Sequence, residues 1–159
     1  MKPRSKTDLR AELVQQLTDM LTTARTAHAS AVEGATHSEA KSENDKDTRG
    51  LEQSYIARGQ AQRVADLEQA VADVEKMNVE PVAAGQPAIM GALVTIDDDG
   101  ETRRYFLAPH GGGNVLAGGV HVVTLSSPVG KALFGKRAGD DVELKLGGKA
   151  RELVVERVE

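Results

Sequence analysis

The feature that most constrains this chain is a regular repeat of apolar and small residues in its first third. Between residues 5 and 33 these residues alternate spacings of four and three, at Leu13, Leu17, Met20, Ala24, Ala27 and Ala31. The spacing places them on one stripe of an α-helix and is typical of a coiled-coil seam. Ser5 or Thr7 is a suitable cap for the start of this helix, and Gly34 predicts its end or a local loosening.

A second helix is predicted from about residue 51 to residue 77. Its seam is formed by Val64, Leu67, Val71 and Val74, with Ala57 continuing the repeat and Gln60 interrupting it. A charged stretch, residues 35–50, separates the two helices. The pattern predicts an antiparallel coiled-coil hairpin over residues 1–77 with an acidic tip. A dimerising coiled coil, or part of a helical bundle, fits the same pattern.

The period of the pattern changes after a predicted linker at residues 78–90, which contains two prolines and a glycine. Beyond it, alternating segments flank the turn sequence DDGE, and VHVVTLS, DVELKL and RELVVERV read as further strands. The stretch SPVGKALFGK reads as a short helix with proline at its first position. Residues 91–159 are therefore predicted to form a small α+β domain, an antiparallel sheet with one short helix.

Composition excludes several classes of function. The formal net charge of -4 argues against bulk attraction to nucleic acid, and the absence of cysteine excludes thiol chemistry and disulfides. The four histidines lack metal-ligand spacing, and the HGGG stretch at 110–113 has no accompanying nucleophile elbow. No apolar run approaches the roughly 20 residues of a membrane span, and no secretory signal is visible. We expect a cytoplasmic protein without membrane association that is not itself an enzyme.

The stretch SSPVGKALFGKRAGDDVEL, residues 126–144, resembles the C-terminal domain of the Gre family of bacterial transcript-cleavage factors. The matching positions are Ser127, Pro128, Ala132, Leu133, Gly135, Lys136, Gly139 and Asp140, while Ser126 stands where the family usually has Asp or Asn. Glu43 with Asn44 and the segment RVADLEQAV are similar to the helical half of the family. The resemblance covers nearly the whole chain and implies an FKBP-like fold for the C-terminal domain.

The resemblance also implies a function. Gre factors dock on RNA polymerase, insert their coiled coil in the secondary channel, and stimulate the intrinsic cleavage of backtracked RNA. Their tip carboxylates assist a Mg²⁺ ion that is shared with the polymerase active centre, so the factor needs no cofactor of its own. Expected partners are therefore RNA polymerase and the nascent RNA 3′ end.

Site residues follow from the same resemblance. Glu43 matches the family glutamate, and Glu39, Asp45 and Asp47 are candidates for a second carboxylate by their position at the tip. Lys46, Arg49, Arg58 and Arg63 are candidates to meet RNA phosphates, although pairing at i, i+4 on a solvated helix explains them equally well. Ser127, Pro128 and Val129 match the polymerase-docking loop, and Ser126 is a further candidate although it departs from the family at the first position of this loop. The same residues also suit a plain helix N-cap.

Three other functions are open to this sequence. Ala40 stands three residues before Glu43, where the family signature has an Asp, which suggests a Gre-like regulator that occupies the channel without cleaving. A scaffold coiled coil without a polymerase partner is a second alternative, although we expect a hairpin that closes on itself to be monomeric. A prolyl isomerase is disfavoured, because Tyr105, Phe106 and Phe134 are too few core aromatics to line a prolyl pocket.

Overall fold

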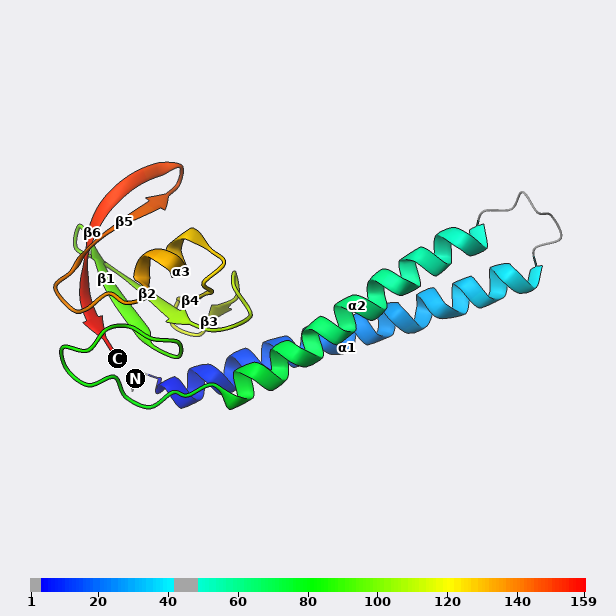
Figure 1. The fold of residues 1–159 in the computed structure, drawn as a ribbon, viewed down its shortest axis with the longest axis horizontal. Helices are drawn as coiled ribbons and strands as arrows, with labels where there is room; N and C mark the ends of the chain where they lie inside the picture. The colour runs from blue at the N-terminus through cyan, green and yellow to red at the C-terminus, as the bar shows by residue number, and fades with distance from the viewer. Residues whose placement is uncertain (1–3, 42–48) are drawn as a thin grey trace. The chain divides into compact units, whose positions relative to one another are not determined.

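The computed structural model describes residues 4–41 and 49–159, with side chains for residues 4–36 and 50–159. The chain contacts group into unit 1, which is Met1–Val14 with Ala72–Glu159, and unit 2, which is Gln15–Val71. In chain order the elements are α1 (Lys6–Lys41), α2 (Arg49–Lys76), β1 (Leu93–Asp98), β2 (Glu101–Leu107), β3 (Val115–Leu116), β4 (Val120–Val123), α3 (Pro128–Leu133), β5 (Asp141–Leu146) and β6 (Lys149–Val158) (Figure 1). The predicted fold class, a helical pair followed by a sheet domain with one short helix, is confirmed.

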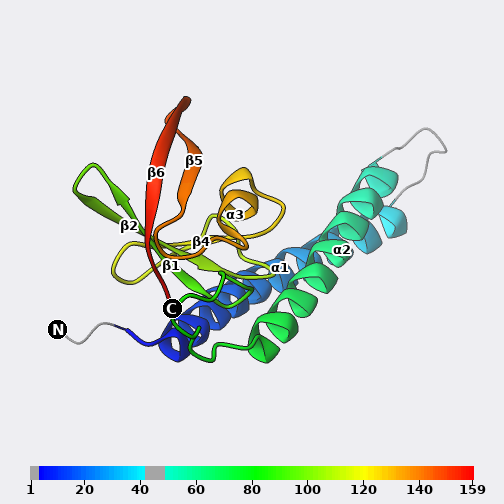
Figure 2. The ribbon, with the colours of Figure 1, turned by 60° about the vertical axis from the view of Figure 1, so that its left-hand side comes forward.

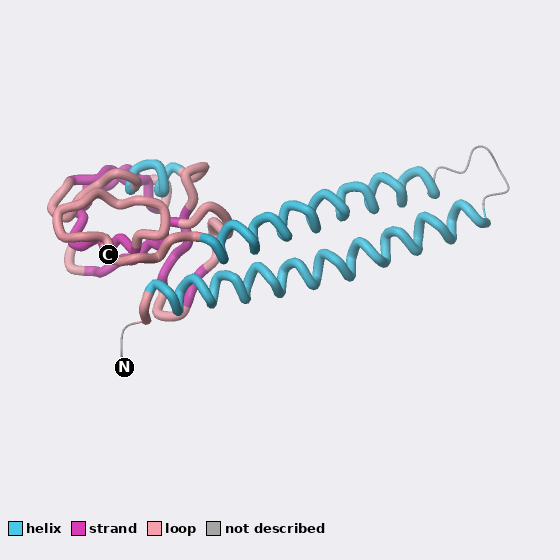
Figure 3. The backbone as a smooth tube through the Cα atoms, turned by 60° about the horizontal axis from the view of Figure 1, so that its bottom comes forward, coloured by secondary structure: helices cyan, strands magenta, loops and turns pink. Residues whose placement is uncertain are grey.

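Unit 2 consists of the middle of α1 and the facing part of α2, which run side by side in opposite directions (Figure 3). Its buried apolar residues are Leu17, Leu21, Ala24, Ala31 and Ala35 on α1, and Leu67 and Ala70 on α2. The predicted seam was right at Leu17, Ala24 and Ala31 but wrong at Met20 and Ala27, which are half-buried. The buried positions of a heptad repeat can be spaced by three and then four residues, or by four and then three. Counted from Leu17, the buried residues Leu21 and Ala24 follow the second spacing, because these positions face α2.

Gly34 does not end α1, contrary to the prediction, because the helix continues to Lys41. A side chain at this position would meet α2, since a Cβ on Gly34 would lie 3.1 Å from Gln53 Oε1. Glycine within a helix costs about 1 kcal/mol relative to alanine. The contact is with the end of the flexible Gln53 side chain, so a larger residue at position 34 would require a small shift of that side chain.

Unit 1 contains a six-stranded sheet in the order β3-β4-β2-β1-β6-β5. Its pairs are antiparallel except for β2 with β4, which are parallel. The prediction of an entirely antiparallel sheet was therefore wrong at this pair. The short strand β3 accounts for the difference. After β2 the chain continues to β3 at the edge of the sheet, and β4 then runs antiparallel to β3 in the place between β3 and β2. As a result, β4 runs in the same direction as β2. The predicted DDGE turn joins β1 to β2, with positive φ at Asp99 and Gly100.

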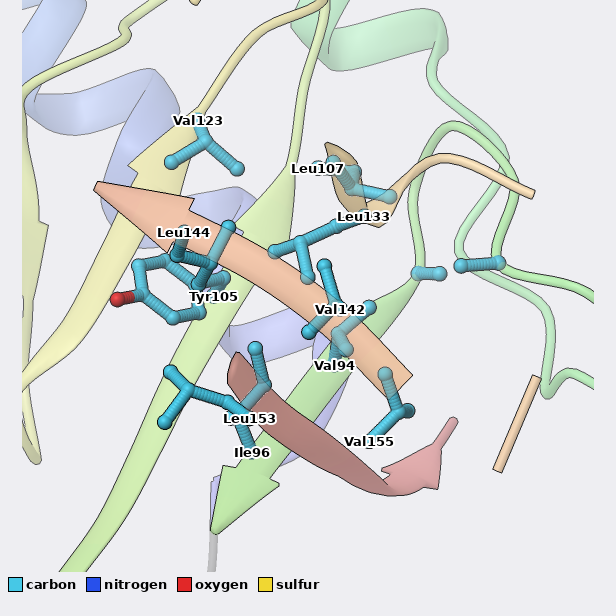
Figure 4. Close-up of a cluster of buried hydrophobic side chains, with 12 residues drawn as sticks. Val94, Ile96, Tyr105, Leu107, Val123, Leu133, Val142, Leu144, Leu153 and Val155 are labelled. Atoms are coloured by element: carbon cyan, nitrogen blue, oxygen red, sulfur yellow. The ribbon is translucent and has the colours of Figure 1, made fainter. Parts of the chain in front are cut away.

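The main core of unit 1 lies between one face of the sheet and α3. Figure 4 shows Val94, Ile96, Tyr105 and Leu107 of β1 and β2 pointing toward Leu133 of α3, together with Val123, Val142, Leu144, Leu153 and Val155. Adjacent residues on one strand point to opposite faces of a sheet, so the buried Leu93 and Phe106 lie on the other face. The centre of the sheet is therefore covered on both sides.

A buried carboxylate joins three strands at one end of this core. Asp98 Oδ2 accepts hydrogen bonds from Arg103 Nε at 2.8 Å and from Arg151 Nη1 at 3.0 Å. The bond to Asp98 is the largest cause of the raised pKa of Arg103. Because Asp98 ends β1 while Arg103 and Arg151 lie on β2 and β6, the carboxylate links β1 to both of its neighbouring strands.

Polar contacts tie the first turns of α1 and the last turn of α2 to the rest of unit 1. Glu12 Oε1 accepts from Ala117 N at 2.8 Å, and Lys6 Nζ donates to Glu80 O at 2.6 Å. His110 Nε2 lies 2.7 Å from Asp73 Oδ2. The predicted linker includes the fully buried Ala88 and is packed against the sheet domain. The predicted domain boundaries remain predictions.

None of the helices in the described part of the chain combines the length and the apolar character that a membrane crossing needs.

Tyr105 provides a test of this core. Burial raises the pKa of its phenol, because the ionised form is disfavoured away from water. A raised pKa in the folded state stabilises the fold below the ordinary value of 10.0, and this contribution is lost as the pH rises through the folded-state pKa. In the Tyr55→Phe variant, Tyr105 is the remaining tyrosine, so ultraviolet absorbance reports on it alone.

We expect its ionisation midpoint to lie above 10.0 and the free energy of unfolding to fall as that midpoint is passed. A second variant with Tyr105→Phe should lose this alkaline dependence. A midpoint at or below 10.0 would contradict the burial of the phenol.

Candidate functional site

The segment that precedes α3 has a fixed conformation, although much of it is exposed. Ser127 is the N-cap, with φ -91° and ψ 149°, and its Oγ accepts a hydrogen bond from Gly130 N at 3.0 Å. The same Oγ donates to Thr124 O at 2.9 Å. Pro128 occupies the first turn, where its missing N–H costs nothing. The N-cap interpretation of Ser127 and Pro128 is therefore confirmed, and it leaves a docking role open.

Gly130 holds this segment close to the chain that leaves β4. A Cβ on Gly130 would lie 1.9 Å from Thr124 O, a distance at which the two backbones would have to separate. Ser126 Oγ lies 2.7 Å from Thr124 Oγ1, so Ser126 is tied to the same residue. Ser126 and Pro128 remain exposed, whereas Val129 is half-buried against the core. The four predicted docking residues are thus brought together at the start of one short helix.

Exposed apolar side chains flank α3 at both of its ends. Leu125 precedes the cap and is 40% exposed, and Phe134 follows the helix and is 44% exposed. The sequence analysis counted Phe134 together with the core pair Tyr105 and Phe106, but the structure places it at the C-cap of α3 with an exposed side chain. Sequence reasoning also missed Leu125, whose neighbours Val122 and Val123 are buried and made it look like part of a strand.

Backbone hydrogen bonds fix the exit from α3. Ala88 N donates to Lys136 O at 2.8 Å, and Ala88 O accepts from Gly135 N at 2.8 Å. Ile89, which follows Ala88, is also exposed. We call Leu125, Pro128, Phe134 and Ile89 the α3 surface. Its apolar side chains are presented on backbone that is already ordered, so little conformational entropy would be lost when a partner binds.

Positive charge accompanies the α3 surface. Lys131 and Arg137 are exposed, Lys136 is half-buried, and the first turn of α3 has no acidic residue. The first acid after the helix, Asp140, accepts from Arg137 N at 2.8 Å and turns the chain into β5. An apolar surface with cations around it suits a protein partner that presents apolar and acidic side chains.

The predicted tip residues fall largely outside the described side chains. Glu39, Glu43, Asp45 and Asp47 belong to this group, as do Lys46 and Arg49. Arg58 is described, and its guanidinium carbon lies 5.6 Å from the centroid of the Tyr55 ring. Arg63 and Asp19 both line an open groove of about 450 Å³ between α1 and α2. Among the residues that the structure describes, no group of three or more His, Asp or Glu side chains is placed to hold a metal ion.

The C-terminal part of the chain matches a known protein family. Residues 85–159 match the family described as "Transcription elongation factor, GreA/GreB, C-term". The chain is similar to the transcription elongation factor GreA of Xylella fastidiosa strain M12, with 33% identity over 99 residues that cover 61% of each chain. It is also similar to the GreA of Beijerinckia indica, with 34% identity over 96 residues that cover 58% of this chain and 59% of the relative. The match thus spans less than two thirds of the length of these relatives.

Among solved structures, the chain is similar to the GreA factor homolog 1 protein of Thermus thermophilus. The two are 23% identical with a TM-score of 0.42, over 92% of this chain and 94% of the other.

The Ser127 cap generates a stability prediction. Ser127→Ala should lower the free energy of unfolding by about 1 kcal/mol, because Gly130 N and Thr124 O both lose a partner. Gly130→Ala should cost more, since its Cβ would overlap Thr124 O. Ser126→Ala is the control and should change stability by less than about 0.5 kcal/mol, because Ser126 is exposed. Urea unfolding measures all three, and equal effects of Ser127→Ala and Ser126→Ala would contradict the cap.

Proposed function

We propose that the protein is an elongation factor that binds RNA polymerase, because residues 85–159 match the GreA/GreB family of transcription elongation factors. The observation that carries the proposal is the α3 surface. It lies within the matched region, hydrogen bonds of Ser127 and Ala88 hold its backbone, and it combines exposed apolar side chains with positive charge. The docking residues in this proposal are Ser126, Ser127, Pro128 and Val129, together with Leu125 and Phe134.

The helical hairpin has a separate role in the proposal, which is to enter the secondary channel of the polymerase. The 36 residues of α1 extend over about 54 Å at 1.5 Å per residue, a length that suits insertion into a channel. The narrow seam of alanines in unit 2 supports this role, because small side chains let two helices lie close together.

The tip carboxylates are assigned to a Mg²⁺ ion that belongs to the polymerase. Glu43 would be the principal ligand, with a second carboxylate from among Glu39, Asp45 and Asp47. Carboxylate oxygens are the hard ligands that Mg²⁺ takes, so the residue types at the tip fit the ion. A second metal ion at a phosphodiester supports cleavage by stabilising the attacking and leaving oxygens. The factor itself would contribute ligands and no catalytic machinery of its own.

Lys46 and Arg49, which flank the tip acids, are assigned to the phosphates of the nascent RNA. A cation near a phosphate contributes sequence-independent affinity that weakens as salt rises.

A second function is favoured by Ala40. The family resemblance calls for an aspartate three residues before Glu43, and an alanine cannot bind a metal ion. A protein that occupies the channel without stimulating cleavage would inhibit or modulate the polymerase at stoichiometric concentration. The same docking surface serves both functions, so only the activity of the bound protein separates them.

Docking is tested with substitutions at the α3 surface. Leu125→Ser and Phe134→Ser should each weaken binding to the cognate polymerase by about tenfold, because exposed apolar anchors contribute most at the centre of an interface. Val154→Ser is the matched control, since Val154 is similarly exposed but lies on β6. Fluorescence anisotropy of the labelled full chain gives the dissociation constants. Equal affinities for all three variants and the native protein would place docking elsewhere.

Cleavage is tested in a stalled, backtracked elongation complex with Mg²⁺. The native protein should shorten the transcript, and Glu43→Ala or Asp45→Ala should reduce the rate about a hundredfold while binding is retained. Glu33→Ala, which removes an exposed acid from α1 away from the tip, should leave the rate unchanged. Binding without cleavage by the native protein would assign it to the channel-occupying class.

A further inference from the structure

A cavity of about 400 Å³ opens where strand β6 leaves strand β1. The two strands pair from Val94 with Val158 to Asp97 with Val154, and β1 ends at the next residue, Asp98. The preceding part of β6 pairs with β5 instead, so the β1–β2 and β5–β6 hairpins diverge at this point (Figure 2). We call this cavity the β1–β6 notch. It is lined by Asp97, Asp98, Asp99, Arg151, Glu152, Leu153 and Val154.

The notch carries a net negative charge, because four of its lining residues are acids and only Arg151 is basic. Asp97, Asp99 and Glu152 are exposed, and within the described part of the chain none of the three forms an ion pair. Glu143 of β5 lies directly opposite Glu152. Like charges in directly opposed positions of two strands repel each other. The negative charge at the notch is therefore not compensated within the fold.

One carboxylate oxygen at the notch is buried without a hydrogen bond. The side chain of Asp98 is 2% exposed, and its Oδ2 accepts from both Arg103 and Arg151. Its Oδ1 has no hydrogen-bond partner among the residues that the structure describes. Such atoms are rare in folded proteins, because the hydration lost on burial is normally replaced by a hydrogen bond. A donor group that enters the notch beside Arg151 would supply the missing bond.

The residue types of the notch select the class of ligand. Carboxylate oxygens attract cations, and Asp98 Oδ1 requires a hydrogen-bond donor. A metal ion does not suit the notch, because no three acidic or histidine side chains in the described residues are placed to hold one. Ammonium groups joined by methylene segments can instead pair one by one with carboxylates that are spread along a cavity. The methylene segments would lie on Val154, which is 45% exposed.

We propose that the β1–β6 notch binds a linear polyamine, a small organic cation with two or more ammonium groups. One ammonium group donates to Asp98 Oδ1 beside the Arg151 guanidinium, and others pair with Asp99 and Glu152. The bound cation bridges the two diverging hairpins and stabilises the folded chain by mass action. The notch shares no residue with the α3 surface, so this inference goes beyond the proposed function and does not depend on it.

The test is a calorimetric titration of the full chain with spermidine at fixed ionic strength. NMR shifts of the backbone amides should locate a single bound spermidine at residues 97–99 and 151–154. Asp99→Asn and Glu152→Gln should each weaken binding about fivefold, because each removes one partner of an ammonium group. Glu156→Gln is the matched control, since it removes the same charge from an exposed position on β6 outside the notch. It should change the affinity less than about twofold.

Arg151→Gln should change the affinity in the opposite direction. It removes the cation that competes with the ligand, so spermidine should bind about fivefold more tightly. Arg157→Gln, which removes an exposed arginine of the same strand outside the notch, is the control and should have little effect. Asp98 keeps its bond from Arg103 in the Arg151→Gln variant, and circular dichroism checks that the fold is retained. Spermidine should also raise the thermal midpoint of this variant more than that of the native protein.

Several outcomes would overturn the site. Equal losses for Glu152→Gln and Glu156→Gln, or amide shifts spread over the other acidic surfaces, would reduce the effect to general attraction by an acidic protein. Weaker binding by Arg151→Gln would contradict the role of Asp98. Mg²⁺ that binds as tightly as spermidine and shifts the same amides would assign the notch to a metal ion. Absence of heat and of amide shifts at millimolar spermidine would overturn the proposal directly.

Discussion

Strand β1 is buried on both of its faces, and the rest of unit 1 is arranged around that burial. It pairs with β2 on one side and β6 on the other, so its backbone is satisfied while its side chains are removed from water. Val94 and Ile96 face the core that also contains Leu133, and Leu93 faces the opposite side. Asp98 ends the strand with a buried carboxylate held by two arginines from the neighbouring strands. Apolar burial provides the driving force, and the carboxylate adds a polar link between β1 and its two neighbouring strands.

The α3 surface depends on this core in a specific way. Leu133 and Gly130 are buried, and they pull the short helix against the sheet. Six residues are too few for a helix that is stable alone, so α3 exists because its inner side is packed and its first turn is capped. The same contacts hold the exposed side of α3 in place, so that side needs no stabilising interactions of its own. This explains how a segment with exposed apolar residues can be both accessible and rigid, which is the property that a docking surface needs.

Unit 2 differs from unit 1 in how its apolar side chains are placed. Its seam narrows to alanines, which bury little area but let two helices lie close together. Large apolar side chains at its outer end point away from the partner helix. A hairpin selected for stability alone would place these residues inward. This arrangement supports the proposal that the hairpin is inserted into the channel of the polymerase.

The sequence by itself determined the helical hairpin, the strand segments after residue 91 other than β3, the turn at Asp99 and Gly100, and the cap at Ser127. These depend on local periodicity, turn chemistry and capping, all of which act over a few neighbouring residues. The tertiary structure alone decided which half of each heptad is buried, as at Leu21 in place of Met20. It likewise decided that α1 continues through Gly34 and that β2 and β4 are parallel. It also decided that Phe134 is exposed and that Tyr55 faces away from α1. Each of these depends on the position of a partner that is distant in sequence, and a local pattern contains no information about that position.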